Sequence, residues 1–209
     1  LVQSLPNLEL IGLHFHIGSQ ITDLSSFENL CVRVNELQDQ FEGKGVKFAN
    51  INIGGGLGIN YEHPNHMPIA DFEAYFRLFN KHLKLREGQR VHCEPGRSIV
   101  AEAGITLYTV GCVKDIVNVR TYVSVDGGMS DNPRYIMYGS KYSAVLANKA
   151  NEENVKKVTI AGKCCESGDL IAVNVPLPKA ESGDILAVLS TGAYNYSMAM
   201  NYNRNLIPP

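Results

Sequence analysis

Residues 54–58 (GGGLG), four glycines and a leucine, offer a place for an anion. Residues without a Cβ atom let consecutive backbone N–H groups turn toward one anion and let that anion come close. Tyr61, His63 and Pro64 follow, so the run matches neither the P-loop nor the dinucleotide-binding pattern. The run either binds a phosphate or forms a tight connection between a strand and a helix.

Two histidines and a serine form a second candidate group. His14 and His16 share one face of a predicted strand, because side chains alternate along a strand. A metal ion would need a third ligand, which no nearby carboxylate or thiol supplies. The ring of His16 could equally stack on an aromatic cofactor whose phosphate Ser19 binds. A hydrogen-bonded histidine is the ordinary alternative, and it is favoured more for His14 than for His16.

An acid and a base stand together in the sequence Glu94-Pro95-Gly96-Arg97. Pro95 and Gly96 predict a tight turn that aims both charged side chains inward. A buried carboxylate is costly without a cationic partner. Glu94 is therefore expected to pair either with Arg97 or with a nitrogen atom of a ligand.

A cysteine followed by an acid, Cys165-Glu166, lies in a loop of small polar residues at 162–169 (GKCCESGD). Such a composition argues against burial in a core. A thiol in this position could donate a proton or act as a nucleophile if its pKa were tuned. An inert surface cysteine is the alternative.

The composition excludes several classes of function. The 209 residues are 44% hydrophobic, with 19 Lys+Arg against 21 Asp+Glu, as in an ordinary soluble globular protein. This balance argues against nucleic-acid binding, and no apolar run approaches the roughly 20 residues that span a bilayer. Five cysteines at irregular spacings, with no CxxC pair, favour a reducing, cytoplasm-like compartment and indicate no metal site.

Strands and helices are expected to alternate over the first hundred residues. Strands are expected at residues 8–17, 46–53 and 90–93, and helices at residues 25–43 and 70–85. Ser25 and Glu28 suit a capping box at the start of the first helix, and Phe76 is among the aromatic residues expected to face inward from the second. This order predicts parallel strands joined by crossover helices, with chemistry at the carboxyl ends of the strands.

The pattern changes beyond about residue 100. Short β-rich stretches separated by Gly, Pro, Asn and Ser predict a mostly antiparallel β domain, with a boundary near residues 100–104. Residues 141–153 could form a short helix within it. Neither Leu1 nor the last residues resemble a natural end of a chain, so both ends are expected to be cut.

Six segments in order resemble one known family: GLHFHIGSQ, GGGLG, CEPGR, VDGGMSDNPRYIMYG, KCCESGD and GAYNYSM. Together they are similar to the diaminopimelate decarboxylases, in the alanine-racemase-like (fold type III) group of pyridoxal-phosphate enzymes. The resemblance implies an α/β fold: residues 1–101 would be the last strands and helices of a pyridoxal-phosphate-binding (β/α)8 (TIM) barrel. Residues 102–209 would form a C-terminal β domain that is incomplete at its end, and the protein would be a homodimer with shared active sites.

The resemblance also implies a role for each candidate residue. The ring of His16 would stack on the pyridine of pyridoxal 5'-phosphate, and Glu94 would pair with the pyridine nitrogen. The other implied cofactor contacts are Ser19, Gly54, Gly55, Gly56, Gly96, Arg97 and Tyr194. The implied substrate contacts are Arg97, Arg134, Tyr138, Glu166 and Tyr194, and Cys165, contributed across the dimer, would be catalytic as the proton donor to the carbanion.

The reaction so implied converts meso-2,6-diaminopimelate to L-lysine and CO2, the last step of lysine biosynthesis, in the cytoplasm or in the plastid stroma of a plant. A substrate with two ammonium and two carboxylate groups needs opposed charges at fixed separation, which Arg97, Arg134 and Glu166 could supply. The alternatives are a related decarboxylase acting on ornithine, arginine or carboxynorspermidine, a non-catalytic regulatory homologue, and an unrelated phosphate- or sugar-binding barrel.

One part of the family pattern is missing. The family forms a Schiff base between the cofactor and a lysine in a Tyr-Ala-Val-Lys-Ala-like strand, and no such segment occurs in this chain. A complete barrel also takes about 250 residues. The chain is therefore expected to be an internal piece of a longer protein, inactive and prone to aggregate when alone because a sheet edge is open.

Overall fold

The computed structural model describes residues 2–64 and 70–207 and divides the chain into two units. The first unit comprises residues up to Ile59 together with Ala70–Ser98. The second comprises residues from Ile99 onward together with the described part of 60–69. No helix in the described ranges is long and apolar enough to cross a bilayer.

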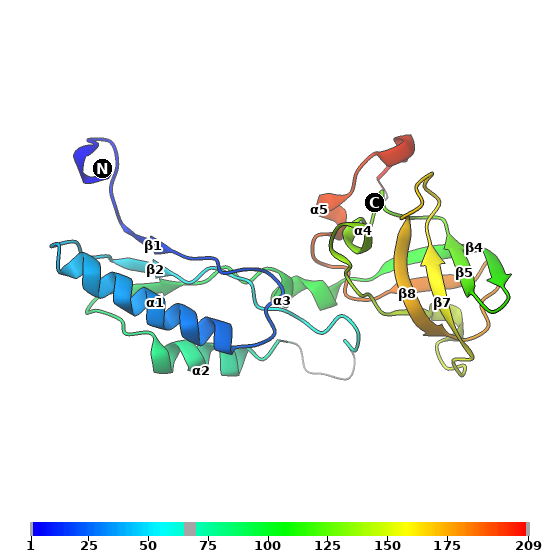
Figure 1. Cartoon of the computed structure of the whole chain (residues 1–209), viewed down its shortest axis with the longest axis horizontal. Helices are drawn as coiled ribbons and strands as arrows, with labels where there is room; N and C mark the ends of the chain where they lie inside the picture. Colours follow the sequence, from blue (N-terminus) through cyan, green and yellow to red (C-terminus); the bar gives the residue numbers. More distant parts are fainter. Residues whose placement is uncertain (1, 65–69, 208–209) are drawn as a thin grey trace. The chain divides into compact units, whose positions relative to one another are not determined.

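The first unit is a three-stranded parallel sheet with two long helices, α1 (Ser25–Glu42) and α2 (Phe72–His82), which cover the same face (Figure 1). Its strands are β1 (Gly12–His14), β2 (Asn50–Asn52) and β3 (Arg90–His92), in that spatial order. A 3-10 helix at Val2–Ser4 precedes them, and a short helix, α3 (Arg97–Val100), follows β3 and includes the last two residues of this unit. The predicted parallel pairing with crossover helices is confirmed.

Aromatic side chains of both helices form the core of the first unit. Phe27 of α1 meets Tyr75 of α2 edge to face, with ring centroids 4.9 Å apart, and both lie on Ile51 and Phe79. Phe76 was expected to face inward but is 42% exposed. A helix turns about 100° per residue, so burying Tyr75 and Phe79, four residues apart, carries Phe76 to the edge of the apolar face.

The expectations for the first strand and first helix need two corrections. The first strand is only three residues long, and Leu8, Ile11 and Ile17 at its flanks are exposed, because β1 is an edge of the sheet. The predicted capping box at Ser25 is absent. The Asp23 carboxylate instead accepts hydrogen bonds from the backbone N–H (3.0 Å) and hydroxyl (2.7 Å) of Ser25, and these bonds lower the pKa of Asp23.

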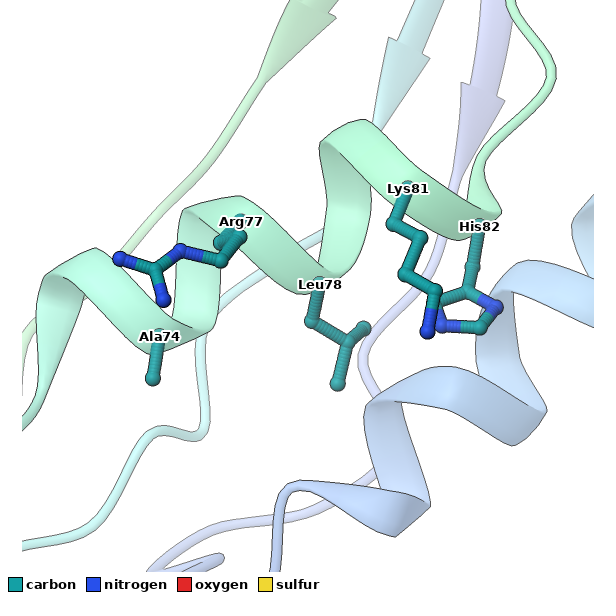
Figure 2. A pocket seen from close by; sticks show the side chains of 5 residues that line it. All are labelled: Ala74, Arg77, Leu78, Lys81 and His82. Atoms are coloured by element: carbon teal, nitrogen blue, oxygen red, sulfur yellow. The ribbon is translucent and has the colours of Figure 1, made fainter.

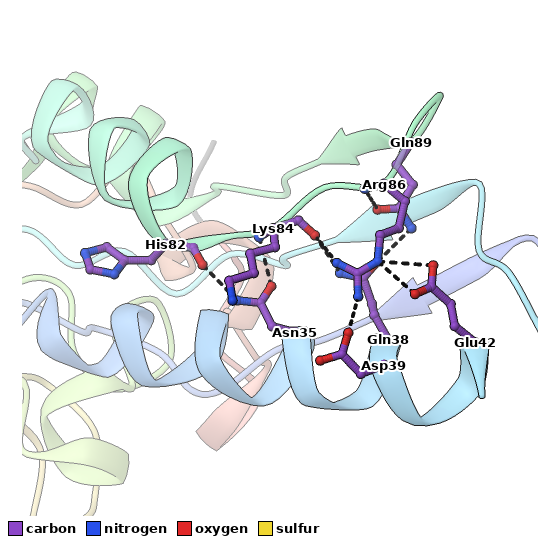
Figure 3. Close-up of polar contacts among 8 residues, drawn as sticks. All are labelled: Asn35, Gln38, Asp39, Glu42, His82, Lys84, Arg86 and Gln89. Atoms are coloured by element: carbon purple, nitrogen blue, oxygen red, sulfur yellow. Dashed lines mark hydrogen bonds and ion pairs between the residues drawn. The ribbon is translucent and has the colours of Figure 1, made fainter. Parts of the chain in front are cut away.

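A polar network joins the end of α1 to the segment after α2 (Figure 3). Gln38, only 1% exposed, accepts a 2.7 Å hydrogen bond from the Gln89 amide. Arg86 forms ion pairs with Asp39 (2.6 Å) and Glu42 (3.1 Å). Acidic side chains of α1 therefore partly neutralise the charge of Arg86.

The second unit is a six-stranded sheet in the order β6-β9-β4-β5-β7-β8. Figure 1 labels β4, β5, β7 and β8 of this sheet. Among the described strands of this unit only β5 and β7 pair in parallel, so the predicted mostly antiparallel character is confirmed. The strands are β4 (Thr106–Ile116), β5 (Arg120–Val125), β6 (Ala144–Leu146), β7 (Lys156–Ala161), β8 (Leu170–Leu177) and β9 (Ile185–Val188). Its short α-helices are α4 (Arg134–Tyr138) and α5 (Asn195–Met198), and its 3-10 helices are Ala101–Ala103, Ala147–Lys149 and Tyr202–Arg204.

The helix expected at residues 141–153 is not formed. That segment contains the strand β6 and the single 3-10 turn Ala147–Lys149. Leu146 is fully buried as β6 pairs with β9, and this pairing overrides the local helical tendency.

Candidate functional site

The carboxyl ends of β1, β2 and β3 bring the first group of predicted residues to one edge of the parallel sheet. The backbone bonds continue past the strands: Phe15 donates to Asn52 (2.9 Å), and Glu94 donates to Gly54 (2.7 Å). His16, the glycines and Glu94 therefore follow neighbouring strand ends, as expected for a site at this edge.

The three glycines are required by the close approach of the strand ends. A Cβ atom at Gly54 would lie 2.0 Å from the Phe15 carbonyl oxygen, and one at Gly55 would lie 2.2 Å from that of Glu94. At Gly56 it would lie 2.3 Å from the Gly18 carbonyl oxygen. These distances support the interpretation of the run as a tight connection after a strand. A tight connection does not exclude anion binding by the same glycines.

The amides of these glycines face the same edge. The N–H of Gly54 donates to the Asn52 side chain (2.8 Å), and that of Gly55 makes a long contact with Nδ1 of His16 (3.5 Å). The Gly56 N–H donates to no acceptor within the described ranges. At least one donor is left for an anion.

Alanine at Gly54 is expected to disrupt the site far more than alanine at Gly45. Both glycines have positive φ angles, 71° and 76°, so both substitutions carry a similar backbone cost of about 1 kcal/mol. Only Gly54 has a backbone atom in the way, because the space at Gly45 is open to 4 Å. In the full-length protein, we expect Gly54→Ala to abolish cofactor binding or folding, measured by pyridoxal-phosphate absorbance and thermal unfolding. Equal behaviour of the two variants would contradict this account.

The environment of Glu94 differs from the expected one. Its side chain is 56% exposed, and it accepts a 2.7 Å hydrogen bond from Asn52 and lies 3.6 Å from Nε2 of His14. Arg97, one of the two alternative partners, is buried and donates from Nη2 to the Ser19 hydroxyl (2.9 Å), which leaves a ligand nitrogen as the other alternative. The reason is geometric: Asn52 stands on the strand next to β3 in register with His92, so its amide reaches the strand end first.

The chemical groups of these residues suit pyridoxal phosphate. The exposed ring of His16 offers a flat face, and the Gly56 amide and Ser19 hydroxyl suit an anion. The half-exposed carboxylate of Glu94 can accept a hydrogen bond from a protonated ring nitrogen. A flat, basic and phosphorylated ligand matches this combination.

In the second unit, Arg134 lies between two tyrosines. Its guanidinium carbon is 5.1 Å from the ring centroid of Tyr138 and 5.1 Å from that of Tyr194. Arg134 is only 6% exposed, its Nη1 contacts the Met198 sulfur at 3.5 Å, and its buried Nε has no hydrogen-bond partner among the described residues. Stacking on two aromatic faces orients the guanidinium without neutralising it. Three predicted substrate residues therefore lie together.

Cys165 and Glu166 lie in an exposed loop of the same unit. The Cys165 N–H donates to the Asn203 side chain (2.7 Å), and Glu166 accepts from the Tyr202 hydroxyl (3.2 Å). Hydrogen bonds from the Gly168 amide, from Tyr202 and from Ser167 lower the pKa of Glu166, so its carboxylate is held in the charged form.

The residue that holds this loop in place, Asp169, was not predicted from the sequence. Asp169 is 3% exposed, and its carboxylate accepts 2.6 Å hydrogen bonds from the backbone N–H groups of Met129 and Cys164. A Cβ atom at Gly162 would lie 2.2 Å from that carboxylate. The sequence did contain a signal for Asp169: it is an acid directly before an apolar strand, with glycines in the segments around it.

A shallow depression of about 220 Å³ lies elsewhere, on α2 (Figure 2). Ala74, Arg77, Leu78, Lys81 and His82 line it, and none of them was singled out from the sequence. Arg77 is paired with Glu73, and His82 lies 3.5 Å from Glu28. No group of three or more His, Cys, Asp or Glu side chains that could hold a metal ion occurs in the described parts of the chain.

Comparison with known proteins shows which proteins this chain resembles in sequence. Residues 1–101 match the model of the pyridoxal-dependent decarboxylase, pyridoxal binding domain. Over 208 residues the chain is 46% identical to a diaminopimelate decarboxylase of Halalkalibacterium halodurans, covering 97% of this chain and 47% of that protein. The chain is similar to the pyridoxal-dependent decarboxylases. It spans about half the length of the curated relatives that it matches.

Solved structures of this decarboxylase family confirm the expected fold class. The Helicobacter pylori diaminopimelate decarboxylase complexed with L-lysine is similar at a TM-score of 0.84 and 30% identity, over 97% of this chain and 49% of that one. A lysine/ornithine decarboxylase from Vibrio vulnificus complexed with cadaverine is similar at a TM-score of 0.80 and 25% identity, over 95% of this chain and 52% of that one. Because both decarboxylases match the fold almost equally, the choice of substrate rests on the site.

Proposed function

We propose that the full-length protein uses pyridoxal 5'-phosphate to decarboxylate meso-2,6-diaminopimelate to L-lysine and CO2. The observation that carries this proposal is the buried Arg134, held between Tyr138 and Tyr194. It lies in a chain 46% identical to a diaminopimelate decarboxylase. The relative solved with L-lysine supports the same product.

The first unit would hold the cofactor. When bound, the cofactor withdraws electrons from the carbon that loses CO2. Glu94 would keep the ring nitrogen protonated, His16 would stack on the ring, and Ser19 with the glycine amides would bind the phosphate. Arg97, which donates to the Ser19 hydroxyl at 2.9 Å, would fix that hydroxyl in place; Gly96, in the turn before it, would lie beside the cofactor.

The second unit would recognise the far end of the substrate. Arg134 supplies planar, paired N–H donors that suit a carboxylate, and the Tyr138 and Tyr194 rings on either side of it limit where that carboxylate can lie. Glu166, whose pKa is lowered by its hydrogen bonds, would bind the distal ammonium. A substrate with a single carboxylate, such as ornithine or lysine, would leave one arginine without an anionic partner, which is costly in a buried site.

Cys165 would complete the reaction. Loss of CO2 leaves an electron pair on the substrate carbon, and the Cys165 Sγ would give its proton to that carbon, with solvent restoring the thiol. The loop that bears Cys165 is exposed within its own unit, which suits a thiol that reaches the active site of a partner subunit in a homodimer.

The lysine that anchors the cofactor would come from the part of the protein outside this chain, since the relatives are about twice as long. The five free cysteines suit a protein that works in the cytoplasm. A regulatory homologue without catalysis is disfavoured, because Cys165, Glu94 and Arg97 are all present.

A genetic experiment tests the proposed function. The full-length gene is expected to let a bacterial strain without diaminopimelate decarboxylase grow in the absence of lysine. A variant with Arg134→Ala serves as the control, and it is expected to fail. Growth of neither strain, with the protein present and folded, would contradict the proposed substrate.

A further inference from the structure

The Cys165 loop is held on its outer side by a turn near the end of the chain that has no assigned role. This turn, Tyr202–Asn205, contacts three consecutive loop residues. The Tyr202 hydroxyl donates to Glu166 (3.2 Å), and Asn203 accepts from the Cys165 N–H (2.7 Å). The three contacts are completed by the Asn205 amide, 3.6 Å from the Cys164 sulfur.

The turn is itself closed by its own hydrogen bonds. The Asn201 side chain donates to the Asn205 carbonyl (2.9 Å), and the Asn205 side chain donates to the Tyr202 carbonyl (3.0 Å). Asn203 has a φ of 52°, a left-handed conformation that asparagine tolerates better than most residues. The conformation aims its side-chain oxygen at the loop amide.

We propose that Tyr202 and Asn203 are positioning residues that set the two reactive side chains of the neighbouring loop. Tyr202 orients the Glu166 carboxylate for the distal ammonium, and Asn203 fixes the backbone of Cys165 and so the place of its thiol. This inference rests on the proposed function, because it assigns the turn to the binding and protonation steps of the same reaction.

The two contacts predict different kinetic effects. Glu166 would bind the ammonium equally in the ground state and the transition state, so loss of the Tyr202 hydroxyl changes KM. Misplacement of the Cys165 thiol affects only proton transfer, so loss of the Asn203 side chain changes kcat. A turn that merely supported the fold would move both constants together.

The contact between Tyr202 and Glu166 also predicts a change in the pH dependence of kcat/KM. Tyr202 is one of the donors that lower the pKa of Glu166, together with Gly168 and Ser167. The titratable groups that act on Tyr202 itself are Glu166, Cys165 and Cys164. Removing the Tyr202 hydroxyl raises the pKa of Glu166. The carboxylate is then lost at a higher pH, and the acid limb of kcat/KM shifts upward.

The experiment compares four variants of the full-length protein loaded with pyridoxal phosphate. Tyr202→Phe is expected to raise the KM for meso-diaminopimelate about fivefold with kcat nearly unchanged. Asn203→Gly, which keeps the positive φ without strain, is expected to lower kcat about tenfold, and Asn203→Asp restores it by keeping the acceptor. Tyr122→Phe, on β5, is the matched control and is expected to behave like the unmodified protein.

A second readout keeps the inference separate from the proposed function. Hydrogen exchange of the Cys165 amide is expected to quicken in Asn203→Gly and not in Tyr122→Phe, whether or not the protein releases CO2 from meso-diaminopimelate. Unmodified protein without that activity would overturn the proposed function alone. Unchanged KM, kcat and exchange in Tyr202→Phe and Asn203→Gly, or equal losses in all four variants, would overturn the positioning role.

Discussion

Replacing Cys165 with alanine in the full-length protein is expected to lower the rate of lysine formation by about two to four orders of magnitude. The cofactor should remain bound, because Cys165 is not among the proposed cofactor contacts, and all of those except Tyr194 lie in the first unit. The measurement is steady-state release of CO2, with pyridoxal-phosphate absorbance recorded on the same sample.

The expected loss is large because one thiol would supply the proton. Alanine removes the donor but keeps the backbone N–H that binds Asn203 at 2.7 Å, so the loop should stay in place. Cys112→Ala is the matched control, since Cys112 is also exposed and lies on β4, outside the proposed site. If Cys165→Ala and Cys112→Ala turn over substrate at the same rate, another group is the proton donor.

Replacing Arg134 with lysine is expected to lower kcat/KM for meso-diaminopimelate by about 10- to 100-fold. A lysine ammonium is a point charge and cannot make the paired planar hydrogen bonds of a guanidinium. It also stacks less well between Tyr138 and Tyr194, whose rings each lie 5.1 Å from the Arg134 guanidinium carbon. The same loss should not occur for a substrate that lacks the second carboxylate.

The control for this prediction is Arg120→Lys. Arg120 also packs over a tyrosine ring, that of Tyr122 at 5.8 Å, but it is exposed and belongs to β5. Both variants therefore replace an arginine that packs over a tyrosine ring, but only Arg134 is buried. Equal kinetics for Arg134→Lys and Arg120→Lys would show that Arg134 does not bind the substrate.

Local sequence was sufficient where the determining contacts are local or periodic. The spacing of apolar residues predicted α1 and α2, and the alternation of strands and helices predicted the parallel pairing of β1, β2 and β3. The glycine run was identified because residues without a Cβ atom allow other backbone atoms to come close, and this property follows from the residue type alone. Capping at Asp23 depends on the residue at which the helix begins, and the burial of Tyr75 in place of Phe76 depends on the rotation of the helix about its axis. Sequence spacing defines both only to within a residue or two.

The partners of the site residues were not predictable from local sequence. Glu94 meets Asn52, 42 residues away, because of the register between β2 and β3. Arg134 meets Tyr194 from a segment 60 residues later, and the loop at 162–169 meets a turn near the end of the chain. Such contacts follow from tertiary pairing, which neither charge nor spacing reveals.

The most direct test of the account is the relative rate at which the full-length protein, loaded with pyridoxal phosphate, releases CO2 from four amino acids. We expect kcat/KM for meso-diaminopimelate to exceed that for L-ornithine, L-arginine and L-lysine by at least about a thousandfold, since the rejected substrates leave a buried arginine unpaired. Equal or faster decarboxylation of ornithine, arginine or lysine would contradict the assignment of Arg134 to a second carboxylate and, with it, the proposed function.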